Sequence, residues 1–192
     1  MLLYEAIKRA IERGKNLRAI GYIINAAVLS PLPRAVATAI YMLEGYGDAN
    51  MPLSLEPRLG DLKTDPRIDK NAVKALKEMA KERYGDDGDA NLAKCLVDSP
   101  AMHDLMFTRA EEGAQALTEI AANNVGKTVL ATSHGVARME IVLRYLNGFR
   151  GTELLNIIGE LIERGGVVEL TFETVDGVTS FVSAKPLTLL SE

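Results

Sequence analysis

The sequence is poor in the residues that build disulfides and metal sites. It contains one cysteine, Cys95, two histidines and no tryptophan among 192 residues. A single cysteine cannot form an internal disulfide, and two histidines with one cysteine argue against a His/Cys metal site. We therefore expect no disulfide and no His/Cys metal site, and we interpret Cys95 as a small buried apolar residue.

Long apolar runs and an excess of one charge are also lacking. No run approaches the length of a membrane-spanning helix, and the N-terminus lacks the ordered regions of a signal peptide. The formal net charge of -4 gives no general attraction to nucleic acid or to an anionic membrane. We expect a cytoplasmic protein, folded as one domain over residues 1–192, with neither nucleic acid nor membrane as a partner.

Short apolar runs alternate with helical patterns along the chain. Apolar periodicity predicts helices over residues 3–20, 69–83, 90–97, 102–123, 136–146 and 152–163. Compact runs predict strands over 25–29 and 128–131, and a hairpin of strands 167–173 and 178–183 around Val175-Asp176-Gly177. Residues 45–61 are interpreted as loop. The pattern predicts an α/β fold, a layered helix/sheet/helix with a mostly parallel sheet and a C-terminal antiparallel hairpin.

The strand predicted over residues 128–131 is followed by Ser133-His134-Gly135 and then by a helix. The first amide groups of such a helix have no partner within it and attract anions, phosphate above all. His134 is therefore placed to touch a bound phosphate; the alternative is that it caps the helix or packs in the loop. The nearby Gly126-Lys127-Thr128 is not a phosphate-binding P-loop, because residue 121 is alanine and a strand follows.

A second junction of the same kind follows the strand predicted over residues 25–29. Ser30 suits a helix N-cap and Pro31 the first helical position. Arg34 then lies in the first turn, where a cation opposes the helix dipole. We interpret Arg34 as an anion ligand; the alternative is that it reaches solvent or a carboxylate. In a parallel sheet both junctions fall on the edge where ligands bind.

Three motifs in this order resemble the histidine phosphatase superfamily, the phosphoglycerate-mutase-like group of phosphatases and mutases. They are Ser30-Pro31-Leu32-Pro33-Arg34-Ala35, then Arg58-Leu59-Gly60-Asp61, then Ser133-His134-Gly135. The resemblance extends from about Leu3 to the hairpin. It implies hydrolase or mutase chemistry through a phosphohistidine: one histidine attacks phosphorus, arginines and a second histidine hold the phosphoryl oxygens, and a carboxylic acid protonates the leaving oxygen.

Carried over to this sequence, the resemblance implies a role for each matching residue. Arg34, Ser133 and Gly135 would bind phosphate, and His134 would be the second, catalytic and phosphate-binding histidine. Asp61 would be the general acid, which requires a raised pKa. No metal or cofactor is implied, and the partner is a phosphorylated small-molecule ligand.

The segment 63–104 corresponds to the part of these proteins that varies the cover of the pocket. We expect it to cover the pocket as an insertion within the single domain, and His103 to contact substrate. His103 is disfavoured as a nucleophile because it neither follows a predicted strand nor precedes a glycine.

One departure from the family pattern decides the expected activity. The superfamily carries its nucleophile in an Arg-His-Gly motif at the end of a first strand, and this sequence contains no Arg-His-Gly. We expect that strand to be missing, activity to be impaired, and the gap to be filled by a rearranged segment or another subunit. Three interpretations stay open: an enzyme whose start omits or has lost the strand, an inactive phosphate-binding relative, and a structural or assembly module. A homo-oligomer is also left open.

Overall fold

The computed structural model describes residues 4–62, 65–85, 95–156 and 166–187. Its internal contacts divide the chain into two compact units. The first comprises Met1–Gly60, Ala116–His134 and Val167–Glu192, and the second comprises Asp61–Gln115 and Gly135–Gly166. The first unit contains the described strands, and the second is built from helices.

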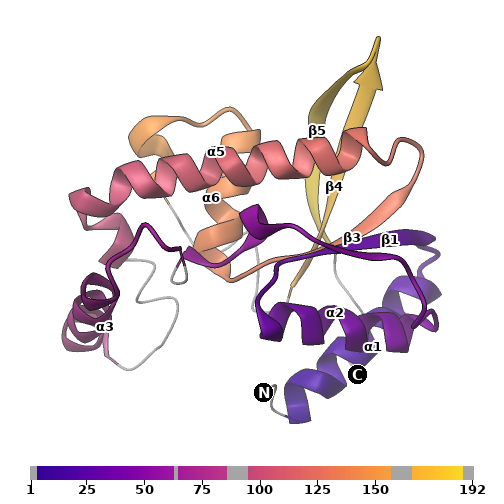
Figure 1. The fold of residues 1–192 in the computed structure, drawn as a ribbon, viewed down its shortest axis with the longest axis horizontal. Coiled ribbons are helices and arrows are strands. Elements are labelled where there is room, and N and C mark those ends of the chain that lie inside the picture. Colours follow the sequence, from indigo (N-terminus) through magenta and orange to yellow (C-terminus); the bar gives the residue numbers. More distant parts are fainter. Residues whose placement is uncertain (1–3, 63–64, 86–94, 157–165, 188–192) are drawn as a thin grey trace. The chain divides into compact units, whose positions relative to one another are not determined.

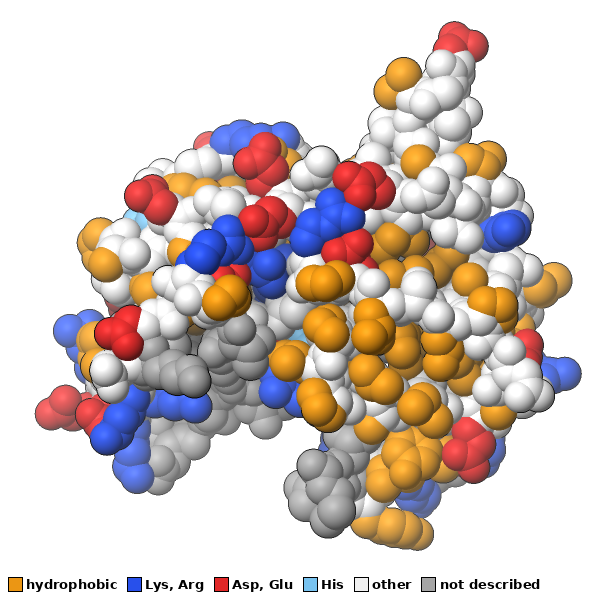
Figure 2. Space-filling model, viewed as in Figure 1, with side chains coloured by type: hydrophobic (Ala, Val, Ile, Leu, Met, Phe, Trp, Pro, Cys, Tyr) orange, Lys and Arg blue, Asp and Glu red, His pale blue; other side chains and the backbone are white. Residues whose placement is uncertain are grey.

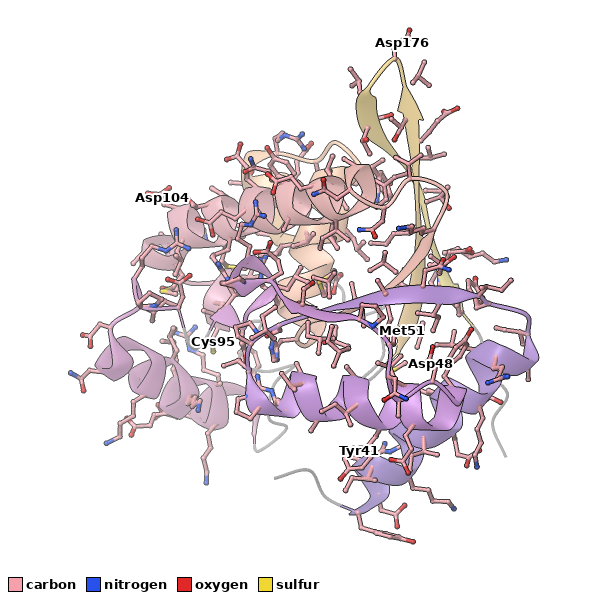
Figure 3. The ribbon with its side chains drawn as sticks, turned by 45° about the vertical axis from the view of Figure 1, so that its right-hand side comes forward. Tyr41, Asp48, Met51, Cys95, Asp104 and Asp176 are labelled. Atoms are coloured by element: carbon pink, nitrogen blue, oxygen red, sulfur yellow. The ribbon has the colours of Figure 1, made fainter. Side chains whose placement is uncertain are left out.

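A three-stranded parallel sheet organises the first unit. Strands β1 (Ile24–Leu29), β2 (Leu53–Leu55) and β3 (Thr128–Thr132) lie in the order β2-β1-β3. Helices α1 (Tyr4–Ala19) and α2 (Pro33–Tyr46) cover one face, and the last turns of α5 (Pro100–Ala122) lie on the other (Figures 1 and 3). The α/β fold with its parallel sheet is therefore confirmed.

The core of the first unit lies between the sheet and the two N-terminal helices. Ala27 and Leu29 of β1 pack with Ala10 of α1 and with Ala39 and Leu43 of α2. The two helices approach so closely that a Cβ atom on Gly14 would lie 1.8 Å from the carbonyl oxygen of Met42. This close approach fixes α1 and α2 against each other.

The predicted C-terminal hairpin is confirmed and is longer than expected. Strands β4 (Val167–Val175) and β5 (Val178–Leu187) pair antiparallel. Asp176, at the tip in Figure 3, and Gly177 form the turn with φ of 50° and 79°, as a two-residue hairpin turn requires. No ladder joins β4 or β5 to the three-stranded sheet in the described part of the chain. The base of the hairpin, at Val167 and Leu187, packs on the same core as Leu130 of β3.

The second unit is a helical cluster around one apolar core. It contains α3 (Lys70–Tyr84), the first turns of α5, α6 (Val136–Leu146) and the 3-10 helix η3 (Gly151–Leu155). Cys95 is completely buried in this core, and burial raises the pKa of its thiol, which fits an unreactive apolar residue. None of the helices that the structure describes is both long and apolar enough to cross a membrane.

The start of α2 differs from the prediction. The helix begins at Pro33 with Leu32 as its N-cap, whereas the sequence pattern placed the cap at Ser30 and the first helical residue at Pro31. Leu32 precedes a proline and is therefore held extended, and Pro33 itself suits the first helical position. The Ser30 hydroxyl is left for another contact.

Two further segments differ as well. Residues 45–61, predicted as loop, contain strand β2 and the 3-10 helix η1 (Pro57–Leu59). A three-residue strand is too short to show a period of two. In the segment 152–163, predicted as a helix, the described residues form the end of η3, and 157–165 lie outside the described residues. Of the helix predicted over 90–97, only residues 95–97 are described, and they are helical.

Candidate functional site

The ends of the three parallel strands form one edge of the sheet. Ser30 follows β1, Glu56 follows β2, and Ser133 follows β3. The ladders continue past the strands, because the Ser30 amide donates to the Thr132 carbonyl oxygen at 3.0 Å and the Glu56 amide donates to that of Leu29 at 2.8 Å. These carboxyl ends are where α/β sheets bind their ligands.

His134 and Ser30 meet at this edge. The Nε2 atom of His134 lies 2.6 Å from the Ser30 Oγ atom, and which of them donates depends on the tautomer of the imidazole. Both side chains are buried: Ser30 is fully covered and His134 is 6% exposed. The Ser30 Oγ atom also accepts from the Leu32 amide at 3.4 Å. His134 does not cap α6, because the N-cap is Gly135 and no side chain caps that helix.

Arg34 and Ser133 occupy the positions that the sequence predicts at the same edge. Arg34 is exposed in the first turn of α2. The Ser133 hydroxyl donates to the Leu59 carbonyl oxygen at 2.8 Å, so its side chain holds η1 against the end of β3. As a phosphate ligand, Ser133 would therefore offer its backbone amide rather than its hydroxyl proton.

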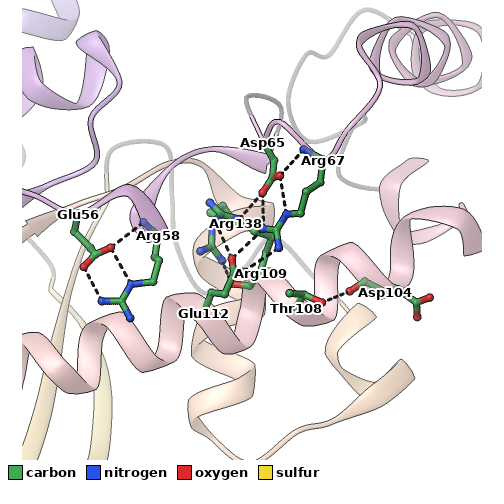
Figure 4. A network of polar contacts seen from close by, with 9 residues as sticks. All are labelled: Glu56, Arg58, Asp65, Arg67, Asp104, Thr108, Arg109, Glu112 and Arg138. Atoms are coloured by element: carbon green, nitrogen blue, oxygen red, sulfur yellow. Dashed lines mark hydrogen bonds and ion pairs between the residues drawn. The ribbon is translucent and has the colours of Figure 1, made fainter.

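Two residues at this edge were not singled out from the sequence. The Oγ1 atom of Thr132 is buried and has no hydrogen-bond partner among the described residues. Glu56 follows β2, the strand that the sequence pattern missed. Its carboxylate accepts from the amide, Nε and Nη2 groups of Arg58 at 2.8 to 2.9 Å (Figure 4). Arg58 also pairs with Glu119 at 2.6 Å.

The pairing with Arg58 controls the charge of Glu56. Hydrogen bonds from the guanidinium hold the pKa of the Glu56 carboxyl below its ordinary value, and the two carboxylates raise the pKa of Arg58. A carboxyl in this state is ionised at neutral pH and cannot donate a proton. Any use of Glu56 as an acid would first require Arg58 to move away.

The remaining predicted residues belong to the second unit. Asp61 is 8% exposed, and Gly135 begins α6. The Nε2 atom of His103 lies 2.7 Å from the Val97 carbonyl oxygen, and its ring packs at a tilt against Phe107. The imidazole of His103 thus braces the helical residues 95–97.

A cluster of charges also lies in the second unit (Figure 4), in which Asp65, Arg109 and Arg138 are buried and Arg67 is exposed. The carboxylate of Asp65 pairs with Arg67 at 2.7 Å and with the Nε atom of Arg109 at 3.1 Å, and Arg109 pairs with Glu112 at 3.0 Å. Arg138 donates to the Arg109 carbonyl oxygen at 2.5 Å. Burial, and then the charge of Arg109, lower the pKa of Arg138 to about 9. Sequence periodicity carries no signal for such a cluster.

The described residues contain no group of His, Cys, Asp or Glu side chains that could hold a metal ion. Among comparisons with known proteins, the family model described as histidine phosphatase superfamily (branch 1) matches residues 4–179. The chain belongs to the histidine phosphatase superfamily. The resemblance seen in the three motifs is thereby confirmed at the level of the superfamily, whose members act on phosphorylated substrates.

One solved structure supports the fold, and a second is reported beside it. YhfR of Bacillus stearothermophilus is 16% identical with a TM-score of 0.57, and the match covers 94% of this chain and 82% of that one. The ecdysone phosphate phosphatase EPPase from Bombix mori, solved with tungstate, is 23% identical with a TM-score of 0.43, covering 74% and 53% of the two chains. A comparison with curated proteins found no match. Membership of the superfamily therefore rests on the family model, and the likeness to YhfR supports the fold alone.

Proposed function

We propose that this superfamily member binds the phosphoryl group of a phosphorylated small molecule at the carboxyl edge of its parallel sheet, as a phosphatase or phosphomutase domain. The observation that carries the proposal is the buried contact between His134 and Ser30. A histidine fixed between two strand ends, beside the first turn of α2, is held where a phosphate would lie.

Each residue at the edge has a physical role in this proposal. Arg34 supplies a full positive charge, His134 supplies an N–H donor through Nε2, and the amides of Ser133 and Gly135 supply further donors. Phosphoryl transfer is mainly positioning and stabilisation of charge on the phosphoryl oxygens, so such donors are what the reaction needs. Ser30 orients the imidazole and competes with the phosphoryl oxygen for its Nε2 atom.

Two carboxyl groups are candidates for the acid that protonates the leaving oxygen. Asp61 ends the second of the three motifs, Arg58-Leu59-Gly60-Asp61, and stays our first assignment. Glu56 is the alternative, because it follows β2 at the edge that holds His134 and Ser30, but it is paired with Arg58. The segment 63–104, of which 63–64 and 86–94 lie outside the described residues, would cover the pocket. His103 would act from it on the substrate only if it left its contact with Val97.

The nucleophile is not assigned to any residue of this sequence. There is no Arg-His-Gly, and the Nε2 atom of His103 is already engaged by a backbone carbonyl oxygen. We infer that a strand carrying the nucleophile would pair with β3. The Thr132 carbonyl oxygen points toward β1, so the backbone groups of Val129 and Ala131 point the other way, where the described chain provides no partner.

The position of α1 fits this inference. In an α/β fold, a helix that leads into one parallel strand normally follows another, and α1 leads into β1. A strand placed before α1 would lie beside the open edge of β3. Without it we expect weak hydrolysis or none. The alternative function is an inactive phosphate-binding or structural module. One observation favours it, which is that the sequence has no Arg-His-Gly.

Two measurements on the 192-residue chain separate these functions. Calorimetric titration with inorganic phosphate should show binding that His134→Ala and Arg34→Ala abolish, while Arg9→Ala, an exposed arginine near the start of α1, leaves it unchanged. Hydrolysis of an aryl phosphate should be negligible. A folded chain that binds no phosphate would refute the phosphate site. Of the functions considered, a structural role would then remain.

Turnover would instead refute the missing nucleophile. In that case, Asp61→Asn and Glu56→Gln distinguish the two acids. Replacing the residue that acts as the acid should slow a substrate with a poor leaving group much more than one with a good leaving group, and replacing the other residue should not. His103→Ala would then test the remaining histidine. Each variant is compared with the wild-type chain by circular dichroism, so that loss of folding is recognised.

A further inference from the structure

The hydroxyl group of Thr132, the last residue of β3, has no role in the proposed phosphate site. Its side chain is 8% exposed, and within the described chain its Oγ1 atom has no hydrogen-bond partner. Buried polar groups are nearly always hydrogen-bonded, because a buried group without a partner costs free energy in the folded protein. Valine has the same shape and carries no such cost. A threonine at this position therefore points to a partner that the folded chain itself does not supply.

The register of the parallel sheet locates this hydroxyl. Thr132 pairs with Leu29 of β1, and residues in register direct their side chains to the same face of a sheet. Leu29 packs in the core between the sheet and the two N-terminal helices, so the side chain of Thr132 lies on the face that α2 covers. Because α2 begins at Pro33, soon after β1 ends, its first turn lies at the same end of that face. The hydroxyl is thus buried beside the first turn of α2, at the carboxyl edge of the sheet.

Neighbouring parts of the sheet do not provide the missing partner. The Ser30 amide donates to the Thr132 carbonyl oxygen, and the Ser30 hydroxyl is in contact with the Nε2 atom of His134 at 2.6 Å. The backbone of a further strand beside β3 would pair in the plane of the sheet, whereas the side chain of Thr132 stands out of that plane. The backbone of Thr132 is therefore fixed in the ladder while its hydroxyl stays available to a bound group.

The first turn of α2 favours an anion as that bound group. The N-cap of α2 is Leu32, no side chain caps the helix, and no acidic residue lies in its first turn. The positive end of the helix dipole is therefore not offset there, and Arg34 adds a full positive charge. Figure 2 shows mainly hydrophobic side chains over α2 and β2, so this surface offers few charges that would attract an anion from a distance. Binding of an anion here depends on donors within the site.

We propose that Thr132 is a further phosphate ligand, whose hydroxyl donates a hydrogen bond to an oxygen of the bound phosphoryl group from the face that α2 covers. This role rests on the proposed function, and it adds a ligand that none of the three sequence motifs contains. A phosphoryl oxygen carries negative charge, and hydrogen bonds to charged groups are stronger than those between neutral groups. Phosphate binding thus gives the buried hydroxyl the partner that it lacks in the ligand-free chain.

Unfolding in urea without phosphate tests whether the hydroxyl is unpartnered in the free chain. Thr132→Val removes the hydroxyl but keeps the β-branched shape, and Thr132→Ser keeps the hydroxyl. Thr132→Val should be at least as stable as the wild-type chain, because the group that it removes makes no hydrogen bond. A lower urea midpoint for Thr132→Val would show that the hydroxyl is bonded within the free chain and would overturn the proposal.

Calorimetric titration with inorganic phosphate tests the ligand role. Thr132→Val should weaken phosphate binding by about 10- to 100-fold, as expected for the loss of one hydrogen bond to a charged group. Thr132→Ser should bind much more tightly than Thr132→Val. The matched control Thr128→Val makes the same change at an exposed position at the start of β3, and it should bind as wild type. Added phosphate should also raise the urea midpoint of the wild-type chain more than that of Thr132→Val.

The outcomes distinguish this role from the proposed function. A wild-type chain that binds no phosphate would overturn both. If the wild type binds phosphate and Thr132→Val binds it equally well, the role of Thr132 is refuted alone, and the site of Arg34 and His134 stands. A Thr132→Ser chain that binds as weakly as Thr132→Val would also refute the hydroxyl as the ligand. Weaker binding by a Thr132→Val chain that is as stable as wild type would support the proposal, because misfolding cannot explain it.

Discussion

Replacing Gly14 by alanine should destabilise the first unit, although alanine is the better helix former. A Cβ atom at Gly14 would lie 1.8 Å from the Met42 carbonyl oxygen and 2.7 Å from the Tyr46 amide nitrogen. At the other side of the crossing, a Cβ atom at Gly45 would lie 2.0 Å from the Ile11 carbonyl oxygen. These neighbours are backbone atoms of a helix, so they cannot rotate aside, and α1 and α2 must separate.

The two opposing effects have known sizes. Alanine in place of a helical glycine gains about 1 kcal/mol of helix propensity. Overpacking a well-packed site costs about 1–3 kcal/mol, and the upper end applies here because the obstructing atoms belong to the backbone. The separation also draws α1 away from the core around Ala10 and Leu17. We expect a net loss of about 2 kcal/mol in the free energy of unfolding, or roughly 4–8 °C in Tm.

Thermal and urea unfolding followed by circular dichroism measure this change. Gly14→Ala and Gly45→Ala should both be destabilised, and the double variant should lose less than the sum, because one separation relieves both clashes. Lys15→Ala, an exposed neighbour in α1, should stay within about 0.5 kcal/mol of wild type. A Gly14→Ala variant as stable as wild type, or more stable, would show that the two helices are not in backbone contact.

Three further predictions concern the polar contacts. Ser30→Ala leaves the Nε2 atom of buried His134 without this partner and should cost about 1–3 kcal/mol, seen as a lower urea midpoint; an unchanged midpoint would contradict the contact. Arg67 holds the pKa of Asp65 below its ordinary value, so the stabilisation is complete above the unfolded-state pKa, about 3.9, and is lost as pH falls through the folded-state value. Asp65→Asn should accordingly weaken the acid-side dependence of urea stability on pH, and a curve as steep as that of wild type would refute the pairing. Arg58→Met should raise the pKa of Glu56, measured by carboxyl NMR titration, and no rise would show that Arg58 is not what depresses it.

Local pattern was sufficient where one segment carries its own signal. The runs over 25–29 and 128–131 are apolar and end at turn-forming residues, and the structure has strands there. Asp176 and Gly177 adopt the positive φ angles that the hairpin turn needs, as their residue types predict. Asp69 caps α3 through the Asn71 amide for the same reason, since a cap and its helix are adjacent in sequence.

Local pattern failed where the outcome depended on distant neighbours. Strand β2 exists because it pairs with β1, and its three residues alone carry no strand signal. With β2 missed, Glu56 was missed as a residue of the sheet edge. The contact of the Ser30 hydroxyl with His134, which is 104 residues away in the sequence, was likewise not predicted.

Local residue patterns were enough to predict most of the described helices, two of the parallel strands, the hairpin and the motifs of the histidine phosphatase superfamily, because each depends on residues close together in the chain. The order in which β1 lies between β2 and β3 became visible in the folded chain alone, and this order brings Ser30 to His134. The tertiary structure also brings the buried side chains of Asp65 and Arg109 together with those of Arg67 and Glu112 in one network of ion pairs. Strand order and buried ion pairs depend on which surfaces pack together in space, and no local periodicity encodes that choice.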